Sequence, residues 1–374
     1  MIRILLVAAA ASTTGGGERH VADLLRLLPR RGCDLALACP AGGDLSQIAQ
    51  SAGIPWIPLG IEQGFSVAEV RRLRRGIVEL APDVVHAHGS RAAFYARLAD
   101  PEAAARVVYT LHGIHVDKAG SALRRALLLF VERVLRRRTR RFVTVCESDQ
   151  RTGARLGMLD PARAHTVYNG VEAHLVGPAA GSAFRAEIGT DSGVPLVLSV
   201  GRFVEPKDQH TLLAAWRDVV AAEPAAVLAL IGSGPLEADL HAAAASLRIA
   251  DSVRFLPPRP DLRPAYAAAD VFAMSSRWEG LPYVVLEAML AGLPVASTAV
   301  DGIPEAVVHG ESGLLVPPRD PSALSGAILE LLTDRERADR LGQAARTRVS
   351  SVFTYDTMVD GLMRVYAEVV EAPA

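Results

Sequence analysis

Two basic side chains in the second half of the chain lie where they could neutralise an anionic ligand. Arg202 and Lys207 follow the apolar run Leu196–Val200, a predicted strand of a parallel sheet, and such sheets bind ligands at the carboxyl ends of their strands. The chain has 38 arginines but only two lysines, so a lysine at this position suggests a need for a compact, flexible ammonium group. A surface charge without a ligand remains the alternative for each residue.

Two glutamates farther along the chain flank a predicted turn and helix. Val271–Met274 predicts a strand, Gly280 a turn, and Pro282 the first position of a helix, whose free amides would bind a phosphate. Glu279 would lie in the turn and Glu287 on the second turn of the helix. Because a carboxylate can accept hydrogen bonds from two adjacent hydroxyls, Glu287 suits a ribose and Glu279 a second sugar. A helix-terminal charge at Glu279 and a solvated Glu287 stay open as the alternative.

The elements that would hold these residues are those of a parallel α/β protein. Half of the residues are hydrophobic and 5% are aromatic, which suits buried parallel strands covered by helices better than a β-sandwich. Apolar runs alternate with stretches of helical spacing through both halves of the chain, which predicts doubly wound sheets. The predicted strands are Ile2–Ala8, 35–39, 84–86, Val107–Leu111, 142–145, Leu196–Val200, Val227–Ile231, Val253–Leu256, Val271–Met274 and 295–297.

The chain is long enough for two domains at roughly 150 residues per domain. We expect these domains at 1–175 and 186–354, followed by a helix over 355–374 that returns toward the first domain. The pattern loosens over 172–185, which contains Gly177, Pro178 and Gly181, so this stretch is predicted to be the linker.

Composition excludes several classes of protein. No apolar run reaches the roughly 18 residues that a membrane-spanning helix needs, and the opening apolar run is too short for a signal peptide, so we expect a cytoplasmic protein. Cys33, Cys39 and Cys146 are odd in number and lack zinc-site spacing, so neither a disulfide framework nor a metal site is expected.

Positive charge is concentrated in the first half. Residues 1–180 carry 24 Lys and Arg against 16 Asp and Glu, and the remainder carries 16 against 25. The segment 123–141 interleaves arginines with the apolar run 127–131, which predicts a basic amphipathic helix able to place the protein at the inner face of an anionic membrane. A core-packing helix with solvated arginines fits equally well, and no nucleic-acid partner is expected. The arginines are Arg124, Arg125, Arg133, Arg136, Arg137, Arg138, Arg140 and Arg141.

Several motifs together resemble the family-4 group of retaining glycosyltransferases, which have the GT-B fold of two Rossmann-like domains facing each other across a cleft. That group has Gly-Arg followed by Lys, two glutamates separated by seven residues, Gly-x-Pro-Glu and Gly-Leu-Leu-Val. Here these are Gly201-Arg202, Lys207, Glu279 and Glu287, Gly302-Ile303-Pro304-Glu305 and Gly313-Leu314-Leu315-Val316. Weaker matches in the first half follow in the matching order, so the resemblance spans essentially the whole chain: Gly15-Gly16-Gly17, Val85-His86-Ala87-His88-Gly89, His112-Gly113 and Asn169-Gly170-Val171.

The resemblance implies a role for each matching residue. Arg202 and Lys207 would clamp the diphosphate of a nucleotide-sugar donor, Glu287 would bind its ribose, and Glu279 would lie at the transferred sugar. From the first domain, His112 would reach the donor sugar and His88 would line the acceptor side. The implied donor-binding residues are Gly16, Gly17, Arg202, Lys207, Glu279, Gly280, Leu281, Val284 and Glu287, and the implied catalytic residues are His112, Arg202, Lys207 and Glu279.

The implied reaction is a metal-independent hexosyl transfer (EC 2.4) with retention of configuration and without a cofactor. Metal-dependent glycosyltransferases bind their cation through an Asp-x-Asp motif, which this sequence lacks, so Arg202 and Lys207 would supply the positive charge. The leaving phosphate oxygen would take the acceptor proton. A double displacement would need a nucleophile, for which Glu279 is the candidate.

The resemblance favours UDP over GDP as the donor base. It implies a glycan, lipid-linked or small-molecule acceptor, in the synthesis of cell-surface polysaccharide, glycolipid or natural-product glycosides. A UDP-sugar 2-epimerase shares the fold but would not be expected to combine the Gly-Arg, Lys and paired-glutamate motifs. A catalytically silent sugar-nucleotide-binding protein stays open. A nicotinamide dehydrogenase is disfavoured because Gly15-Gly16-Gly17 lacks the third spaced glycine of that fingerprint.

Overall fold

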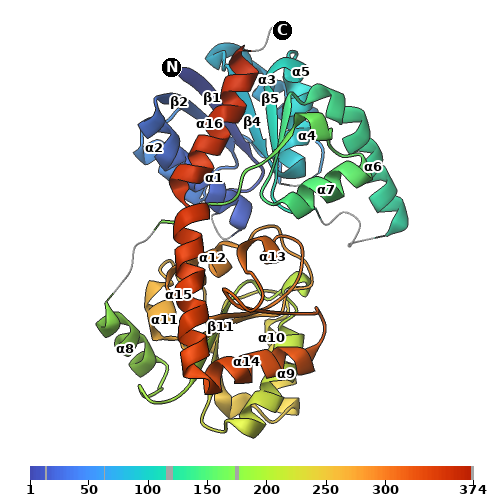
Figure 1. Ribbon diagram of the computed structural model, residues 1–374. Helices are drawn as coiled ribbons and strands as arrows, with labels where there is room; N and C mark the ends of the chain where they lie inside the picture. Colours follow the sequence, from blue (N-terminus) through green and yellow to red (C-terminus); the bar gives the residue numbers. More distant parts are fainter. Residues whose placement is uncertain (13–14, 63, 115–120, 173–176, 372–374) are drawn as a thin grey trace. The chain divides into compact units, whose positions relative to one another are not determined.

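The computed structural model describes residues 1–12, 15–62, 64–114, 121–172 and 177–371 (Figure 1). The chain forms two compact units, of which the first contains Met1–Asn169 and Tyr355–Ala374 and the second contains Gly170–Thr354. Each unit is built on one parallel sheet with helices on both faces. None of the described helices is long and apolar enough to cross a membrane.

The sheet of the first unit has seven strands in the order β3-β2-β1-β4-β5-β6-β7. The order reverses between β1 and β4, which both pair with neighbours in parallel register. In doubly wound sheets, ligands bind at the carboxyl ends of the strands at such a reversal. The strands are β1 (Ile2–Ala8), β2 (Cys33–Cys39), β3 (Trp56–Pro58), β4 (Val84–His88), β5 (Val107–Leu111), β6 (Arg141–Thr144) and β7 (Ala164–Thr166).

Alternate side chains of β1 face the two helical layers of this unit. Ile4 and Leu6 pack with helices α1 and α16, whereas Leu5 and Val7 pack with α3 and α4. All four side chains are buried, so β1 forms the centre of the core. The helices are α1 (Gly16–Leu27), α2 (Asp44–Ser51), α3 (Val67–Leu80), α4 (Gly89–Ala99), α5 (Ala103–Arg106), α6 (Ala122–Leu135), α7 (Glu147–Leu156) and α16 (Tyr355–Glu371), with short 3₁₀ turns at Leu28–Arg31, Arg136–Arg138 and Pro161–Arg163.

The sheet of the second unit has six strands in the order β10-β9-β8-β11-β12-β13, so the order reverses between β8 and β11. The strands are β8 (Leu196–Val200), β9 (Val227–Ile231), β10 (Val253–Leu256), β11 (Val271–Met274), β12 (Val295–Thr298) and β13 (Leu314–Val316). The helices are α8 (Pro178–Glu187), α9 (Gln209–Ala222), α10 (Glu237–Ser246), α11 (Arg263–Ala268), α12 (Tyr283–Leu290), α13 (Ile303–Ala306), α14 (Pro321–Thr333) and α15 (Arg335–Val352), with 3₁₀ turns at Glu205–Lys207 (η4) and Ala250–Ser252.

These two doubly wound sheets confirm the predicted α/β fold class, and each predicted strand is present within two residues of its expected ends. Three strands were not predicted: β3, β7 and β13. Each has three residues and lies at an edge of its sheet. Three residues are too few to show the periodicity of a strand in the sequence, which is why these short edge strands were missed.

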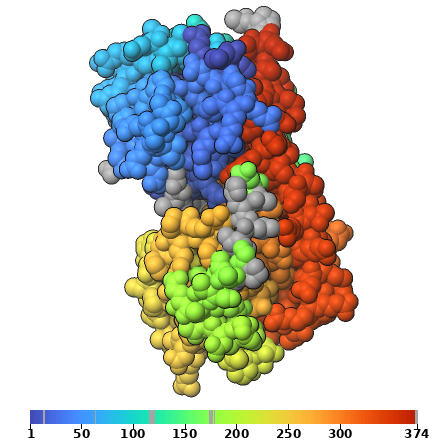
Figure 2. Space-filling view, turned by 90° about the vertical axis from the view of Figure 1, so that its left-hand side faces the viewer, coloured from blue at the N-terminus to red at the C-terminus, as the bar shows by residue number. Residues whose placement is uncertain are grey.

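The stretch 178–185, predicted to be part of a linker, is instead helical and belongs to the second unit. Pro178 occupies the first turn of α8, a position that does not need its missing amide proton. Gly181 lies so close to α11 that a Cβ atom there would come within 2.6 Å of the Ala267 carbonyl oxygen. Figure 2 shows the green surface of α8 against the yellow and orange surface of the second unit. The division of the chain falls earlier, between Asn169 and Gly170.

Candidate functional site

The central feature of the second unit is an ion pair at the point where the strand order reverses. Lys207 ends the turn η4 after β8, and Glu279 lies in the loop after the adjacent strand β11. The Lys207 Nζ atom lies 2.5 Å from Glu279 Oε1, which also accepts a 2.6 Å hydrogen bond from Ser276 Oγ. The Glu279 side chain is 11% exposed, so it is not a solvated surface charge. Among the described residues, the second carboxylate oxygen of Glu279 has no partner.

The loops that carry Lys207 and Glu279 are fastened to each other through backbone contacts. The Arg277 amide donates to the Pro206 carbonyl at 2.8 Å, and Ser275 Oγ donates to the Asp208 carbonyl at 2.8 Å. The Arg277 guanidinium also pairs with Glu205 at 2.7 Å. These contacts fix the separation of the two loops before any ligand binds.

The loop after β12 supports the same arrangement. Asp301 accepts a 2.8 Å hydrogen bond from the Glu279 amide, and the Gly302 amide donates to the Gly280 carbonyl at 3.2 Å. Asp208 and Asp301 have positive φ values of 47° and 44°, a left-handed conformation that costs energy for residues other than glycine. Such strain persists where surrounding contacts hold it, and it is common at functional sites.

Arg202 differs from Lys207 in being exposed and unpaired. Its backbone carbonyl is held by Gln209 Nε2 at 2.9 Å, which fixes the start of the loop after β8. In the part of the chain that the structure describes, the Arg202 guanidinium makes no ion pair or hydrogen bond. It is therefore a cation available to an incoming anion at the same edge of the sheet.

Glu287 lies on α12, where Tyr266 orients it. Tyr266 is buried and its hydroxyl donates to Glu287 Oε2 at 2.9 Å. Pro282 is the residue before the first helical turn of α12, not its first helical residue as predicted, with φ −75° and ψ 124°. Val284 lies in that first turn and is partly buried. Leu281 and Gly280 precede the helix and are buried.

The two later motifs of the second half have structural roles. Gly302 of the Gly-Ile-Pro-Glu motif holds the loop of Glu279, as described above. Gly313 begins the Gly-Leu-Leu-Val motif, where a Cβ atom would lie 2.6 Å from Val307 Cγ1 and 2.8 Å from the Val295 carbonyl oxygen. Only glycine therefore allows β13 to approach β12 this closely.

In the first unit, the glycine loop and His112 lie together at the corresponding strand reversal. Gly16 and Gly17 form the first turn of α1, with Gly15 as the preceding cap residue. A helix start of this kind presents backbone amides to an anion. A Cβ atom on Gly17 would lie 3.1 Å from His112 Cδ2, so the glycine leaves room for the imidazole.

His112 belongs to a cluster of four histidine rings with His20, His86 and His88. The His88 Nδ1 and His112 Nε2 atoms are 3.1 Å apart, and His20 Nδ1 lies 3.1 Å from Asn169 Oδ1. Burial lowers the pKa of His20 to about 4, and burial together with neighbouring histidines lowers the pKa of the other three well below the usual value. The cluster is therefore uncharged at neutral pH.

His88 is more deeply placed than its predicted role on the acceptor side requires. Its side chain is 6% exposed, whereas His112 is partly exposed. His86 is fully buried between Tyr366 Oη at 2.7 Å and Thr110 Oγ1 at 2.6 Å, so it is a packed histidine of the strand β4. His112 is thus the member of this trio that a ligand can reach.

The basic segment 123–141 contains a helix, α6, with a strongly exposed apolar face. Leu123, Leu127, Phe130 and Val134 follow one another at helical spacing and are 54–82% exposed. Several arginines that the sequence places on this segment instead bind carbonyl or carboxylate oxygens of the first unit. These are Arg133 with Leu156, Arg136 with Gly157, Arg138 with Arg97 and Asp100, and Arg141 with Glu368.

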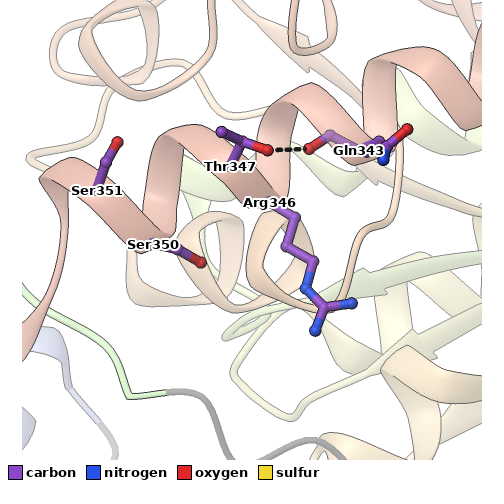
Figure 3. A pocket seen from close by; sticks show the side chains of 5 residues that line it. All are labelled: Gln343, Arg346, Thr347, Ser350 and Ser351. Carbon is purple, nitrogen blue, oxygen red and sulfur yellow. Dashed lines mark hydrogen bonds between the residues drawn. The ribbon is translucent and has the colours of Figure 1, made fainter.

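A separate hollow of about 490 Å³ lies along α15, and none of the predicted site residues lines it (Figure 3). It is lined by Gln343, Arg346, Thr347, Ser350 and Ser351, all from one helix. Figure 3 shows these side chains pointing in different directions along the helix, so they do not converge on a common ligand.

Sequence reasoning missed Ser276, Asp301 and Tyr266, which hold the predicted carboxylates in place. Ser276 and Asp301 are adjacent to residues of recognised motifs, so their neighbourhood was a usable signal. Tyr266 lies on α11 in a run of alanines, where nothing in the sequence indicates that it reaches Glu287.

Comparison with known proteins gives two matches that together cover most of the chain. Residues 182–348 match the model described as Glycosyl transferases group 1, and residues 14–175 match Glycosyltransferase Family 4. A D-inositol 3-phosphate glycosyltransferase of Geodermatophilus obscurus is 33% identical over 310 residues, which is 78% of this chain and 68% of the relative.

Other curated relatives match a shorter part of the chain, and solved structures share its fold at lower sequence identity. The lipopolysaccharide core biosynthesis glycosyltransferase LpsE of Rhizobium meliloti is 36% identical over 183 residues, 49% of this chain and 53% of the relative. The matched region spans about half the length of this and several other curated relatives. The crystal structure of Anabaena HepE in complex with UDP and glucose superposes with a TM-score of 0.86 at 21% identity, covering 98% of this chain and 100% of HepE. The chain belongs to glycosyltransferase family 4, within the glycosyl transferases of group 1.

Proposed function

We propose that the chain is a retaining glycosyltransferase that moves a sugar from a nucleoside diphosphate to a hydroxyl of an acceptor. The observation that carries this proposal is the Lys207–Glu279 pair, which joins a cation for a phosphate and a carboxylate for a sugar at the strand reversal of the second unit. The contacts of both loops hold this pair in place without a ligand.

The diphosphate is assigned to Arg202 and Lys207, with the start of α12 as a further donor. Arg202 offers an exposed guanidinium, and Lys207 lies farther along the same loop, at the end of the turn η4. Fixed cations and amides of this kind stabilise the negative charge that grows on a leaving phosphate. The mechanism therefore requires no metal ion, and EDTA is expected to leave turnover unchanged.

The sugars are assigned to the two glutamates and His112. Glu287, oriented by Tyr266, binds the ribose. Glu279 uses its unpaired oxygen for hydroxyls of the transferred sugar, while its paired oxygen stays on Lys207 and Ser276. Its negative charge also supports positive charge at the anomeric carbon. His112 contributes an uncharged hydrogen-bonding group from the first unit.

Retention follows if the acceptor attacks from the face that the nucleotide leaves. The bond from the anomeric carbon to the phosphate oxygen breaks, the bond to the acceptor oxygen forms, and the leaving phosphate oxygen takes the acceptor proton. Glu279 does not act as a nucleophile in this scheme, because one of its oxygens is held by Lys207 and Ser276 and the other is assigned to sugar hydroxyls.

The acceptor is proposed to be presented at an anionic membrane surface that docks on α6. The exposed apolar stripe of α6 can enter the lipid interface, and the guanidinium groups of Arg124 and Arg137, which have no partner among the described residues, can meet anionic head groups. UDP is favoured as the base because the similar fold of HepE is known with UDP and glucose. Names of relatives that include inositol phosphate and lipopolysaccharide core point to an anionic or lipid-linked acceptor.

Slow hydrolysis of the donor tests this function without knowledge of the acceptor. The full chain is incubated with UDP- and GDP-linked hexoses, with and without EDTA, and the released sugar is followed by NMR before it mutarotates. The proposal expects the α-anomer to appear first from an α-linked donor, with or without EDTA. Release of the β-anomer first, or dependence on a divalent cation, would contradict it.

A further inference from the structure

The four histidines of the first unit come from three neighbouring elements at one edge of the sheet. His20 lies on α1, His86 and His88 on β4, and His112 directly after β5. Ring centroids are 4.1 Å apart for His86 and His88, 5.4 Å for His88 and His112, and 5.0 Å for His20 and His112. In the part of the chain that the structure describes, no three His, Cys, Asp or Glu side chains are arranged to hold a metal ion. Another reason for the cluster is needed.

Each ring of the cluster is neutral, so each has one N–H donor and one acceptor nitrogen. In a neutral imidazole, the hydrogen bond made by one nitrogen determines whether the other carries the proton. The contact between His88 Nδ1 and His112 Nε2 is therefore informative, because one of the two nitrogens must donate and the other must accept.

The environment of His88 decides between these two arrangements. Its Nε2 atom is buried and has no hydrogen-bond partner among the residues that the structure describes. If His112 donated, the single proton of His88 would lie on that Nε2 atom and create a buried donor without an acceptor. Buried N–H groups without a partner are rarer in folded proteins than acceptors without one. The favoured arrangement therefore has the proton on His88 Nδ1.

The proton on His88 Nδ1 also determines which nitrogen of His112 is protonated. Its Nε2 atom accepts from His88, so its own proton lies on Nδ1. Gly17 packs against the Cγ–Cδ2 edge of the ring, and Nδ1 has no partner among the described residues. Among the described residues this N–H group has no acceptor, so it can donate to a ligand.

We propose that His88 is a positioning residue that fixes His112 as the Nδ1–H tautomer, so that His112 donates a hydrogen bond to a hydroxyl or phosphate oxygen of the donor sugar nucleotide. This inference rests on the proposed function for the identity of the ligand, although the tautomer can be measured without any ligand. An uncharged donor binds oxygen without placing a positive charge beside the electron-poor anomeric carbon, where an imidazolium would oppose the reaction.

The tautomer is tested by NMR of the full chain with ¹⁵N-labelled histidine and no ligand. Long-range proton–nitrogen correlations distinguish protonated from unprotonated ring nitrogens, and the signals that disappear in His112→Gln identify His112. The proposal expects a protonated Nδ1 and an unprotonated Nε2 on His112 at pH 7.5. A protonated Nε2 on His112 would overturn it, whatever the activity of the protein.

Two variants of His88 test its role through His112. In His88→Asn, the side-chain amide can replace the Nδ1–H donor, whereas His88→Leu cannot donate. With the sugar nucleotide that the parent hydrolyses, kcat is expected to stay within about threefold in His88→Asn and to fall by roughly a hundredfold in His88→Leu, as for loss of one donor to a developing charge.

Equal activity of folded His88→Leu and the parent would overturn the proposal, as would a loss in both variants despite retained folding by circular dichroism. If the parent showed no sugar-nucleotide hydrolysis at all, the proposed function would fail while the tautomer measurement would still stand. The failures of the two proposals are thus distinguishable.

Discussion

The Glu279 carboxylate and its backbone amide are both held before a ligand is present. Lys207 and Ser276 bind the carboxylate, and Asp301 binds the amide. Preorganised groups of this kind do not have to reorient during the reaction. This preorganisation is the main source of electrostatic stabilisation of a transition state. The orientation of Glu287 depends in part on the hydrogen bond that its carboxylate accepts from the buried Tyr266 hydroxyl.

That dependence predicts the behaviour of Tyr266→Phe. Removal of the hydroxyl loses the hydrogen bond to Glu287 without removing the ring from the core. UDP affinity is expected to fall by roughly tenfold, because a hydrogen bond to a charged group contributes about 1.5–3 kcal/mol and the orientation of Glu287 is only partly lost. Calorimetry measures the change.

Tyr95→Phe is the matched control, since it removes a buried hydroxyl that accepts from the Ser66 amide in the first unit. Its UDP affinity should equal that of the parent. If the two variants lost affinity equally, Tyr266 would have no specific connection to the nucleotide.

At the scale of elements, the carboxyl ends of β8, β11 and β12 carry loops that brace one another. The sequence predicted these strands and the residues that follow them, because each strand begins with apolar residues. It did not predict the contacts between the loops, since contacts such as Arg277 with Pro206 join positions 71 residues apart and involve backbone atoms that leave no side-chain pattern.

The residues Gly177, Pro178 and Gly181 predicted a linker where α8 lies, because they are typical of loops. A helix start and a close contact between helices also select these residues.

Helix α6 contributes few residues to the core of the first unit and exposes several apolar side chains. Its buried residues are Glu132, which pairs with Arg97, and Leu135. Binding to anionic vesicles is expected to weaken by at least about tenfold in Leu127→Ser/Phe130→Ser, since each apolar side chain removed from water contributes about 1.5–3 kcal/mol. Co-sedimentation with vesicles of defined anionic content measures this.

Val78→Ser provides the control for α6. Val78 is 67% exposed on α3 and is not part of the α6 stripe, so this change should leave vesicle binding as it is in the parent. A parent protein that failed to sediment with anionic vesicles at low salt would remove the membrane-docking proposal.

At the scale of the whole molecule, the neutral histidine cluster links stability to pH. The pKa of His20 is lowered from 6.5 to about 4 by burial, so between these values the unfolded chain binds a proton that the folded chain does not. The free energy of unfolding is therefore highest above pH 6.5 and falls as the pH drops toward 4. One such histidine contributes a slope of about 1.4 kcal/mol per pH unit.

Urea unfolding at pH 7.5 and pH 5.5 measures this slope. Carboxylates contribute to the parent value, so the informative quantity is the difference between the parent and His20→Gln. The variant should lose less stability between the two pH values, whereas His210→Gln, at an exposed position, should lose as much as the parent. Identical pH dependence in the parent and His20→Gln would contradict a neutral, buried His20.

The proposed function requires that the second unit bind the donor diphosphate through Lys207. The most direct test is calorimetric titration of UDP and GDP into the parent, Lys207→Met and Arg217→Ala, of which the last removes an exposed arginine of α9 outside the site. We predict that the parent and Arg217→Ala bind the preferred nucleotide equally and that Lys207→Met binds it at least about tenfold more weakly, as expected for loss of one charged hydrogen bond. Unchanged nucleotide affinity in folded Lys207→Met would contradict the account.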